Sequence, residues 1–172
     1  MARMRKSLVL AAILLASPAL GAEATALSVE GLTRASDSVV RGQVRKTTSI
    51  LSDDGRRIFT LVDVDVSSTW RGDRVASVQV IVPGGVVGGI GQRVDGAPAF
   101  AGGEEVVVFL NRAEAGGYRV AGMAQGKFSV AGMNATPDLS RTRMVSEQVG
   151  PGEHRAEGMS VADLERLVRS VP

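Results

Sequence analysis

The sequence IFTLVDVDV, residues 58–66, decides the fold. When side chains alternate, Ile58, Thr60 and the three valines fall on one face, and Phe59, Leu61 and the two aspartates fall on the other. A period of two is the pattern of a β-strand, because successive side chains of a strand point to opposite faces. We therefore predict a half-buried strand whose valine face lies in the core.

Two further segments show the same alternation. Residues 39–47, VVRGQVRKT, precede the strand at 58–66. The residues SDDG at 52–55, which are typical of a turn, separate the two segments. Residues 75–82 alternate again, after the turn WRGD at residues 70–73. This order predicts antiparallel hairpins, in which Gly42 marks a bulge or tight curvature.

The rest of the chain adds shorter strands and a helix near each end. Residues 105–110, EVVVFL, are almost wholly apolar, which is typical of a strand buried on both faces or under the end of a barrel. Residues 118–123 and 126–130 predict two more strands. Helices are predicted over 27–37, with Ser28 as N-cap, and over 159–171, where Ser160 and Asp163 resemble a capping box.

The predicted fold class is therefore mainly β. We expect a small antiparallel barrel of the oligonucleotide/oligosaccharide-binding (OB) type, with five to seven strands, a short N-terminal helix and a C-terminal helix. A sandwich is the alternative. The barrel domain with its N-terminal helix spans 25–134, a polar loop or arm without period follows over 135–158, and the C-terminal helix occupies 159–172.

Residues 1–24 have the plan of a secretory signal peptide. Arg3, Arg5 and Lys6 precede an apolar stretch over 7–16, and small residues suited to cleavage follow at 19–21 and again at 22–24. The alternative is a membrane anchor, but ten apolar residues fall short of the roughly 20 that a spanning helix needs. We expect an exported protein, periplasmic or secreted, with no membrane span in the mature chain.

Composition excludes several function classes. The chain has no cysteine, which rules out disulfides, zinc fingers, iron–sulfur ligation and thiol nucleophiles. It has 20 basic and 18 acidic residues, of which residues 1–24 hold three and one, so the mature chain carries 17 of each. A net charge near zero gives no general reason to bind nucleic acid or a membrane surface.

The sequence PGGVVGGIGQ, residues 83–92, raises the question of a phosphate-binding loop. It follows a predicted strand and opens a segment, 84–103, that holds eight glycines. A Walker loop needs a lysine, but none lies between Lys46 and Lys127, and no dinucleotide-binding glycine register or following helix is present. The segment is interpreted as a connection beside the barrel opening, where glycine also allows close approach of a ligand.

No other group of residues makes a convincing catalytic set. His154 is the only histidine and lies in the polar arm. Asp63 and Asp65 share the face that we expect to meet solvent, and a patch of basic residues (Arg41, Arg45, Lys46, Arg56 and Arg57) lacks the aromatic residues that stack nucleic-acid bases. We expect no catalytic residues, no metal, no cofactor and no nucleic-acid partner.

Four stretches carry a resemblance to a known family: SDSVVRGQV (36–44), VSSTWRGD (66–73), VQVIVPGG (78–85) and FAGGEEVVVFL (100–110). Their order is similar to the OB barrel of netrin-like modules and tissue inhibitors of metalloproteinases, and the chain also resembles an uncharacterised group of bacterial exported proteins. The resemblance implies a barrel. Those modules use disulfides, and the inhibitors place an N-terminal cysteine on zinc, so the resemblance does not carry their inhibitory mechanism to a chain without cysteine.

The predicted function is an exported, non-enzymatic β-barrel module that binds a protein or a component of the cell envelope. The alternative is a hydrolase or protease inhibitor of unfamiliar type, built from Asp63, Asp65, Glu104 or Glu105. Trp70 with Arg71 is either an exposed cation–π pair or a plug at the barrel end, and GKF at 126–128 is either a turn with a core anchor or a contact. The predicted partner-binding residues are Trp70, Arg71, Gly84, Gly85, Gly88, Gly89, Phe100 and Gln125.

Overall fold

The structure is a computed structural model that describes residues 22–172. The predicted signal peptide, 1–24, lies outside the described residues except for its last three. The fold is mainly β, with 51% strand and 13% helix, and it contains a closed barrel of five strands, which confirms the predicted fold class. None of the helices within 22–172 is long and apolar enough to cross a membrane.

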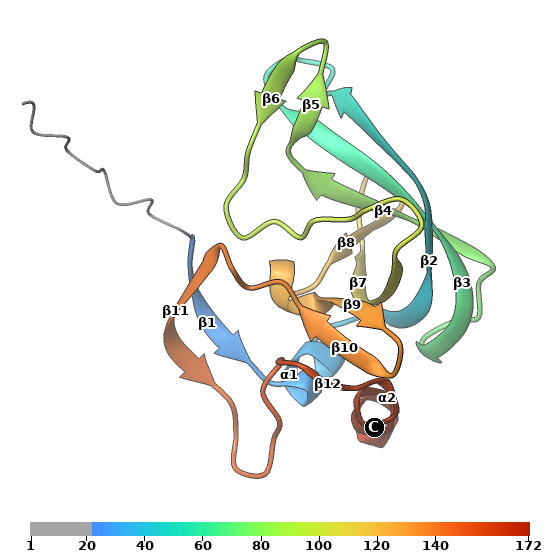
Figure 1. The fold of residues 1–172 in the computed structure, drawn as a ribbon, viewed down its shortest axis with the longest axis vertical. Helices are drawn as coiled ribbons and strands as arrows, with labels where there is room; N and C mark the ends of the chain where they lie inside the picture. The colour runs from blue at the N-terminus through green and yellow to red at the C-terminus, as the bar shows by residue number, and fades with distance from the viewer. Residues whose placement is uncertain (1–21) are drawn as a thin grey trace, which may run out of the picture.

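The barrel closes through β7, β2, β3, β4 and β8, in that order, with β8 returning to β7 (Figure 1). Neighbouring strands are antiparallel, except that β4 and β8 meet in parallel. The strands are β2 (Ser38–Leu51), β3 (Ile58–Arg71), β4 (Ser77–Pro83), β7 (Glu105–Arg112) and β8 (Tyr118–Val120).

The alternation in β3 has the predicted consequence. Ile58, Val62 and Val64 are at most 3% exposed, whereas Asp65 on the opposite face is exposed. Gly42 lies where the register between β2 and β3 shifts, and a Cβ atom there would stand 2.3 Å from the Asp65 carbonyl oxygen. Only glycine lets the two strands approach this closely, so the predicted bulge is confirmed.

Three more strands extend the sheet from β7: β9 (Lys127–Ala131), β10 (Asn134–Pro137) and β12 (Met159–Ser160). Helix α1 (Val29–Arg34) is shorter than predicted, but Ser28 caps it by accepting a hydrogen bond from the Gly31 amide at 2.9 Å. Helix α2 (Val161–Ser170) begins at the predicted cap Ser160, whose hydroxyl accepts from the Asp163 amide at 3.0 Å.

The segment 135–158, predicted to be a loop or arm, contains most of β10 and all of β11 (Thr142–Gln148), which corrects the loop prediction. Strand β11 pairs in parallel with β1 (Ala22–Leu27), outside the barrel sheet. Most residues of β11 are exposed, so its sequence carries no apolar face that would reveal a strand. The partner strand also lies far away in the sequence, where no local pattern can point to it.

Two clusters of buried side chains lie on the two sides of β7. The barrel core fills the barrel with valines and Leu110, and Phe100 packs against it. The outer core lies between the sheet and both helices and contains Trp70, Phe109 and Phe128. Because residues 106–110 alternate between the two clusters and are all fully buried, β7 is buried on both faces, as predicted.

Candidate functional site

The first part of the glycine-rich segment folds into a small hairpin. Strands β5 (Gly85–Val87) and β6 (Ile90–Gln92) pair across Gly88 and Gly89, whose φ values are +55° and +83°. Positive φ at both central residues is the condition for the tight type I′ turn, which favours glycine. The glycines therefore build a hairpin, and the interpretation of 83–92 as a connection rather than a phosphate loop is consistent with this geometry.

The hairpin is anchored on the barrel by polar contacts. The Thr60 hydroxyl donates to the Gly84 carbonyl oxygen at 2.8 Å, and the Ile58 amide donates to the Gln92 side-chain oxygen at 2.5 Å. At Gly85, with φ +139°, a Cβ atom would stand 2.4 Å from the Ser49 hydroxyl oxygen. Glycine at this position lets the segment lie directly on β2 and β3.

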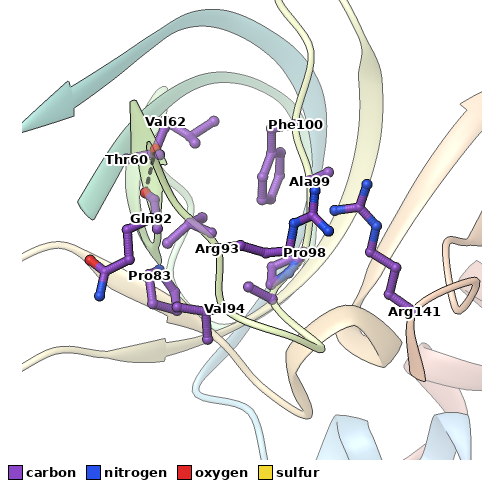
Figure 2. Close-up of a pocket in the computed structure, with 14 residues that line it drawn as sticks. Thr60, Val62, Pro83, Gln92, Arg93, Val94, Pro98, Ala99, Phe100 and Arg141 are labelled. Carbon is purple, nitrogen blue, oxygen red and sulfur yellow. Dashed lines mark hydrogen bonds between the residues drawn. The ribbon is translucent and has the colours of Figure 1, made fainter. Parts of the chain in front are cut away.

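A cavity of about 250 Å³ lies between this segment and the barrel, and we call it the mouth cavity. Figure 2 shows Phe100 and Val62 on the barrel side, with the Arg93 and Arg141 side chains on the outer side. Its lining comes from β3, β4, the glycine-rich segment and the arm: Thr60, Val62, Val82, Pro83, Gly84, Gly85, Gln92, Arg93, Val94, Ala97, Pro98, Ala99, Phe100 and Arg141.

The two arginines give the mouth cavity its charge. Arg93 follows β6, and Arg141 belongs to the β10–β11 turn, so segments far apart in the sequence bring them together. In Figure 2 the Arg141 side chain extends toward the Arg93 guanidinium group. Both residues are exposed, and within residues 22–172 neither guanidinium group makes an ion pair or hydrogen bond, unlike Arg34, Arg41, Arg45, Arg112, Arg143, Arg155, Arg166 and Arg169.

A carboxylate close to Arg141 is already engaged. Hydrogen bonds from the side chain and amide of Ser140 lower the pKa of Asp138, with smaller contributions from the positive charges of Lys127 and Arg141. The Asp138 carboxylate therefore caps its own turn. The guanidinium groups at the mouth cavity remain available to an anion from outside.

Behind Phe100 lies a buried polar cluster. The Lys127 ammonium group is 2.5 Å from the Glu104 carboxylate and 2.7 Å from the Ser129 hydroxyl, and it lies 5.3 Å from the centre of the Phe100 ring. The Lys127 side chain is 4% exposed. Lys127 and Ser129 both follow the barrel-facing period of β9, so they enter the barrel beside its aliphatic core.

The electrostatics of this cluster favour a fixed ion pair. Burial raises the pKa of Glu104, but hydrogen bonds from Lys127 and Ser129 outweigh burial and hold that pKa below its ordinary value. The Lys127 ammonium group and the Ser129 hydroxyl are both engaged by the Glu104 carboxylate. The cluster therefore holds Phe100 and the start of β7 against the barrel.

The four carboxylates of the enzyme alternative do not converge. Glu104 points to Lys127, whereas Glu105 pairs with Arg41 at 2.7 Å on the other face of β7. Asp63 and Asp65 lie 3.9 Å and 3.5 Å from Arg45. Asp65 and Glu105 border one surface depression, but each is held by an arginine. Among residues 22–172, no group of three histidine, aspartate or glutamate side chains could hold a metal ion.

The predicted contact residues are divided between different parts of the structure. Gly84, Gly85 and Phe100 line the mouth cavity, and Gly88 and Gly89 form the exposed hairpin turn beside it. The sequence did not indicate Arg93 or Arg141. The β10–β11 turn places Arg141 at the cavity that Arg93 also lines. The only sequence signal for this placement was that both arginines lie in segments rich in turn residues.

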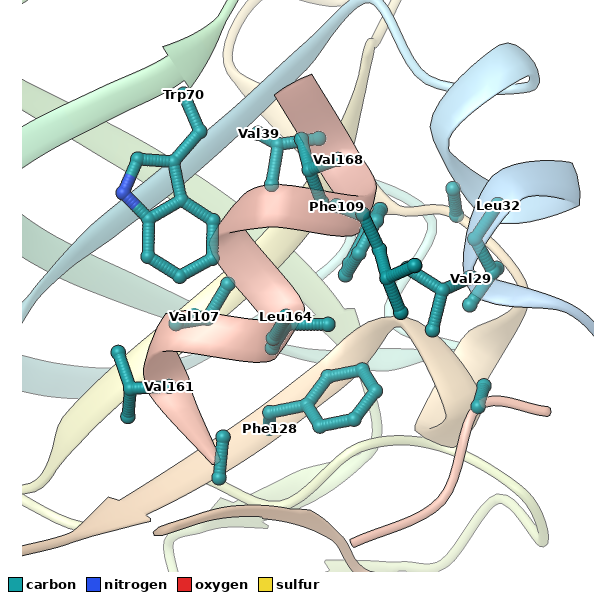
Figure 3. Close-up of a cluster of buried hydrophobic side chains, with 14 residues drawn as sticks. Val29, Leu32, Val39, Trp70, Val107, Phe109, Phe128, Val161, Leu164 and Val168 are labelled. Atoms are coloured by element: carbon teal, nitrogen blue, oxygen red, sulfur yellow. The ribbon is translucent and has the colours of Figure 1, made fainter. Parts of the chain in front are cut away.

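The other predicted contact residues serve the fold. Trp70 is 5% exposed, and Figure 3 shows its ring against α2, so it belongs to the outer core and is neither an exposed cation–π pair nor a plug at the barrel end. The Arg71 guanidinium lies 3.4 Å from the Val171 carbonyl oxygen behind α2. Gln125 is 5% exposed and clamps β1, accepting from the Leu27 amide at 2.8 Å and donating to the Thr25 carbonyl oxygen at 3.0 Å.

His154 lies at the surface, as expected of an arm residue. Its Nδ1 atom is 2.8 Å from the Glu30 carboxylate, and its amide donates to the same carboxylate at 2.9 Å. The pair joins the arm to the first turn of α1. It is a structural contact with no second catalytic group beside it in the described part of the chain.

No family model, curated protein or solved structure matches the chain. The barrel is therefore established by its own strands, and the relation to netrin-like modules stays a prediction.

Proposed function

We propose that the protein is an exported, non-enzymatic binding module that holds an anionic group of a protein or envelope component in the mouth cavity. The observation that carries this proposal is the pair Arg93 and Arg141, two cations without a partner in the described structure that line one cavity. A guanidinium group presents a planar fork of donors that matches carboxylate and phosphate oxygens. Two such groups at a concave site favour a ligand that carries negative charge.

The size of the mouth cavity limits what it accepts. Pockets for whole small molecules usually span about 300–1,000 Å³, and the mouth cavity is smaller, at about 250 Å³. Its inner wall is apolar, with Val62, Val82 and Phe100. These features support one charged group attached to a small apolar body, projecting from a larger partner.

The non-enzymatic part of the proposal is supported by the engagement of the reactive side chains. Lys127 and Glu104 neutralise each other behind Phe100, and the surface carboxylates pair with arginines. The export part is supported by the signal-peptide pattern in residues 1–24. N-terminal sequencing of the protein from an envelope fraction tests it, because a retained Met1 would contradict processing.

The binding proposal is tested by NMR of the arginine Nε–Hε groups in labelled protein, titrated with sodium acetate and inorganic phosphate. We expect saturable shifts at Arg93 and Arg141, and only uniform, weak shifts at Arg74, which lies at the opposite end of β3 and β4. Equal behaviour of all three arginines would contradict the site. In parallel, crosslinking from envelope extracts should give a partner that is lost in Arg93→Gln/Arg141→Gln and kept in Arg74→Gln.

A further inference from the structure

The barrel has its weakest strand pairing between β4 and β8, and we call this junction the seam. All seven residues of β4 pair with β3, but β8 pairs with β4 at one position, Val80 with Tyr118. Strand β8 still lies beside β4 and closes the barrel there.

A second cavity, of about 280 Å³, opens at this seam, and we call it the seam cavity. Its walls carry large apolar side chains: Phe59, Ile81, Val120 and Met123. It shares Val82, Pro83 and Pro98 with the mouth cavity, so the two cavities lie on opposite sides of one wall. An apolar concavity of this size fits one large apolar side chain of a partner.

Met123 stands at this cavity in an unfavourable backbone conformation. Its φ is +57°, and no other non-glycine residue of the described chain has a positive φ. The preceding Gly122 is tightly packed, since a Cβ atom there would stand 2.5 Å from Leu32 of α1. The packing on α1 therefore holds Met123 in this conformation, with a side chain that is 42% exposed. Strain maintained at an exposed, adaptable side chain is typical of binding sites.

Two arginines add positive charge to the same cavity. Arg57 and Arg119 line it, both are exposed, and in residues 22–172 neither makes an ion pair. Asp54 lies in the turn before Arg57, and its pKa is lowered mainly by hydrogen bonds from Ser52 and Arg56 and less by the charge of Arg57. The cavity thus combines an apolar interior with two cations that have no anion of their own.

We propose that the seam cavity takes the large apolar side chain of an acidic peptide, whose flanking carboxylates pair with Arg57 and Arg119. This inference rests on the proposed binding function and names the class of partner. A lipid acyl chain would suit the apolar lining alone. The two cations favour a peptide that carries carboxylates beside its apolar side chain.

The first experiment measures fluorescence anisotropy with a labelled probe peptide, Asp-Glu-Leu-Phe-Glu-Asp. Two matched peptides serve as controls: Lys-Arg-Leu-Phe-Arg-Lys reverses the charge, and Asp-Glu-Ala-Ala-Glu-Asp removes the apolar side chains. We expect the probe to bind at least about tenfold more tightly than either control, since both the ion pairs and the buried side chain contribute. Equal affinity for the probe and the alanine peptide overturns the inference.

The decisive variant is Met123→Gly. Glycine adopts positive φ freely, so the melting temperature should rise by about 2–4 °C while affinity for the probe falls about tenfold. A variant that is more stable and yet binds more weakly excludes general damage to the fold as the cause. The matched control is Met133→Ala, which changes an exposed methionine in the β9–β10 turn and should leave affinity unchanged. Unchanged affinity in Met123→Gly overturns the inference.

Three further measurements separate this inference from the proposed function. Arg57→Gln/Arg119→Gln should weaken the probe about tenfold, whereas Arg74→Gln should not. Arg93→Gln/Arg141→Gln should abolish the acetate and phosphate shifts and keep the probe affinity. If the probe is lost in that variant alone, the mouth cavity binds the peptide and the seam inference fails. Competition of the probe by phosphatidylglycerol vesicles, with no preference for the acidic peptide, also overturns it.

Discussion

The two cores of the molecule differ in composition and in enclosure. The outer core holds three aromatic side chains, Trp70, Phe109 and Phe128, and is covered by α1 and α2. The buried members of the barrel core are valines and one leucine, and its aromatic cover consists of the half-buried Phe100 and Tyr118. A five-strand barrel is narrow, so small branched side chains fill it, whereas a sheet packed on helices has room for rings.

This difference separates stability from recognition. Around the outer core, elements from both ends of the chain pack over aromatic rings, such as Phe109 and Phe128 with centres 5.9 Å apart. The barrel core, in contrast, is covered by the glycine-rich segment, which contains no helix. The mouth cavity and the seam cavity both border this segment. We infer that the outer core supplies most of the rigidity on which the barrel mouth depends.

The largest expected effect comes from removing an aromatic ring of the outer core. Phe128→Ala should lower the free energy of unfolding by about 3–5 kcal/mol, because Phe128 is fully buried. The matched change in the barrel core, Val80→Ala, removes a smaller volume and should cost about 1–3 kcal/mol. Urea denaturation of both variants measures the difference. Equal losses would break the comparison between the two cores.

A smaller effect is expected at the ion pair beneath the mouth. Glu104→Gln leaves the Lys127 charge buried without its carboxylate and should lower the free energy of unfolding by about 2–3 kcal/mol at neutral pH. The pKa of Glu104 in the folded protein lies below its ordinary value of 4.5, so the stabilisation is complete above pH 4.5 and is lost as pH falls through the lowered pKa.

The pH dependence gives this prediction a second measurement. Denaturation of the unmodified protein at a series of pH values below 4.5 should show stability decreasing, and Glu104→Gln should show a smaller decrease over the same range. The control is Glu105→Gln, which removes a partly exposed surface carboxylate and should change stability by less than about 1 kcal/mol. If the two variants behave alike, Glu104 and Lys127 do not form the fixed pair described above.

The smallest expected effect on stability belongs to Phe100. Phe100→Ala removes a half-buried ring and its contact with the Lys127 ammonium group, which together should contribute about 1–2 kcal/mol. The same change opens the inner wall of the mouth cavity. We therefore expect the affinity for an anion at Arg93 and Arg141 to fall more, in free-energy terms, than the free energy of unfolding does. A loss as large as that of Phe128→Ala would show that the mouth is part of the structural core.

Residues with a strict local pattern could be predicted from the sequence. The alternation in β3, the bulge at Gly42 and the caps Ser28 and Ser160 each depend on neighbours within a few residues, and each has the predicted place. The glycine-rich segment was interpreted as a connection beside the barrel opening, and in the structure it forms the β5–β6 hairpin and lines the mouth cavity.

The rest of the site depends on pairings across long distances in the sequence. Arg93 and Arg141 line the same cavity although 47 residues lie between them in the chain, and β11, which follows Arg141, shows no period that would reveal it as a strand. The motif at 126–128 was interpreted as a turn with a core anchor or as a contact, and nothing in it indicated a buried Lys127, because a charged residue usually faces solvent. Its burial depends on Glu104, which a different segment supplies.

The parallel pair of β1 and β11 has a consequence for the order of events during synthesis. Thr25 and Ser146, whose hydroxyl groups are 2.8 Å apart, are separated by 121 positions in the chain. Strand β1, which begins within the last three residues of the predicted signal peptide, therefore has no partner until almost the whole polypeptide has emerged. Pairings between such distant residues form slowly. A chain that completes its fold this late stays extended while it crosses a translocation channel, and that delay suits the proposed route out of the cytoplasm.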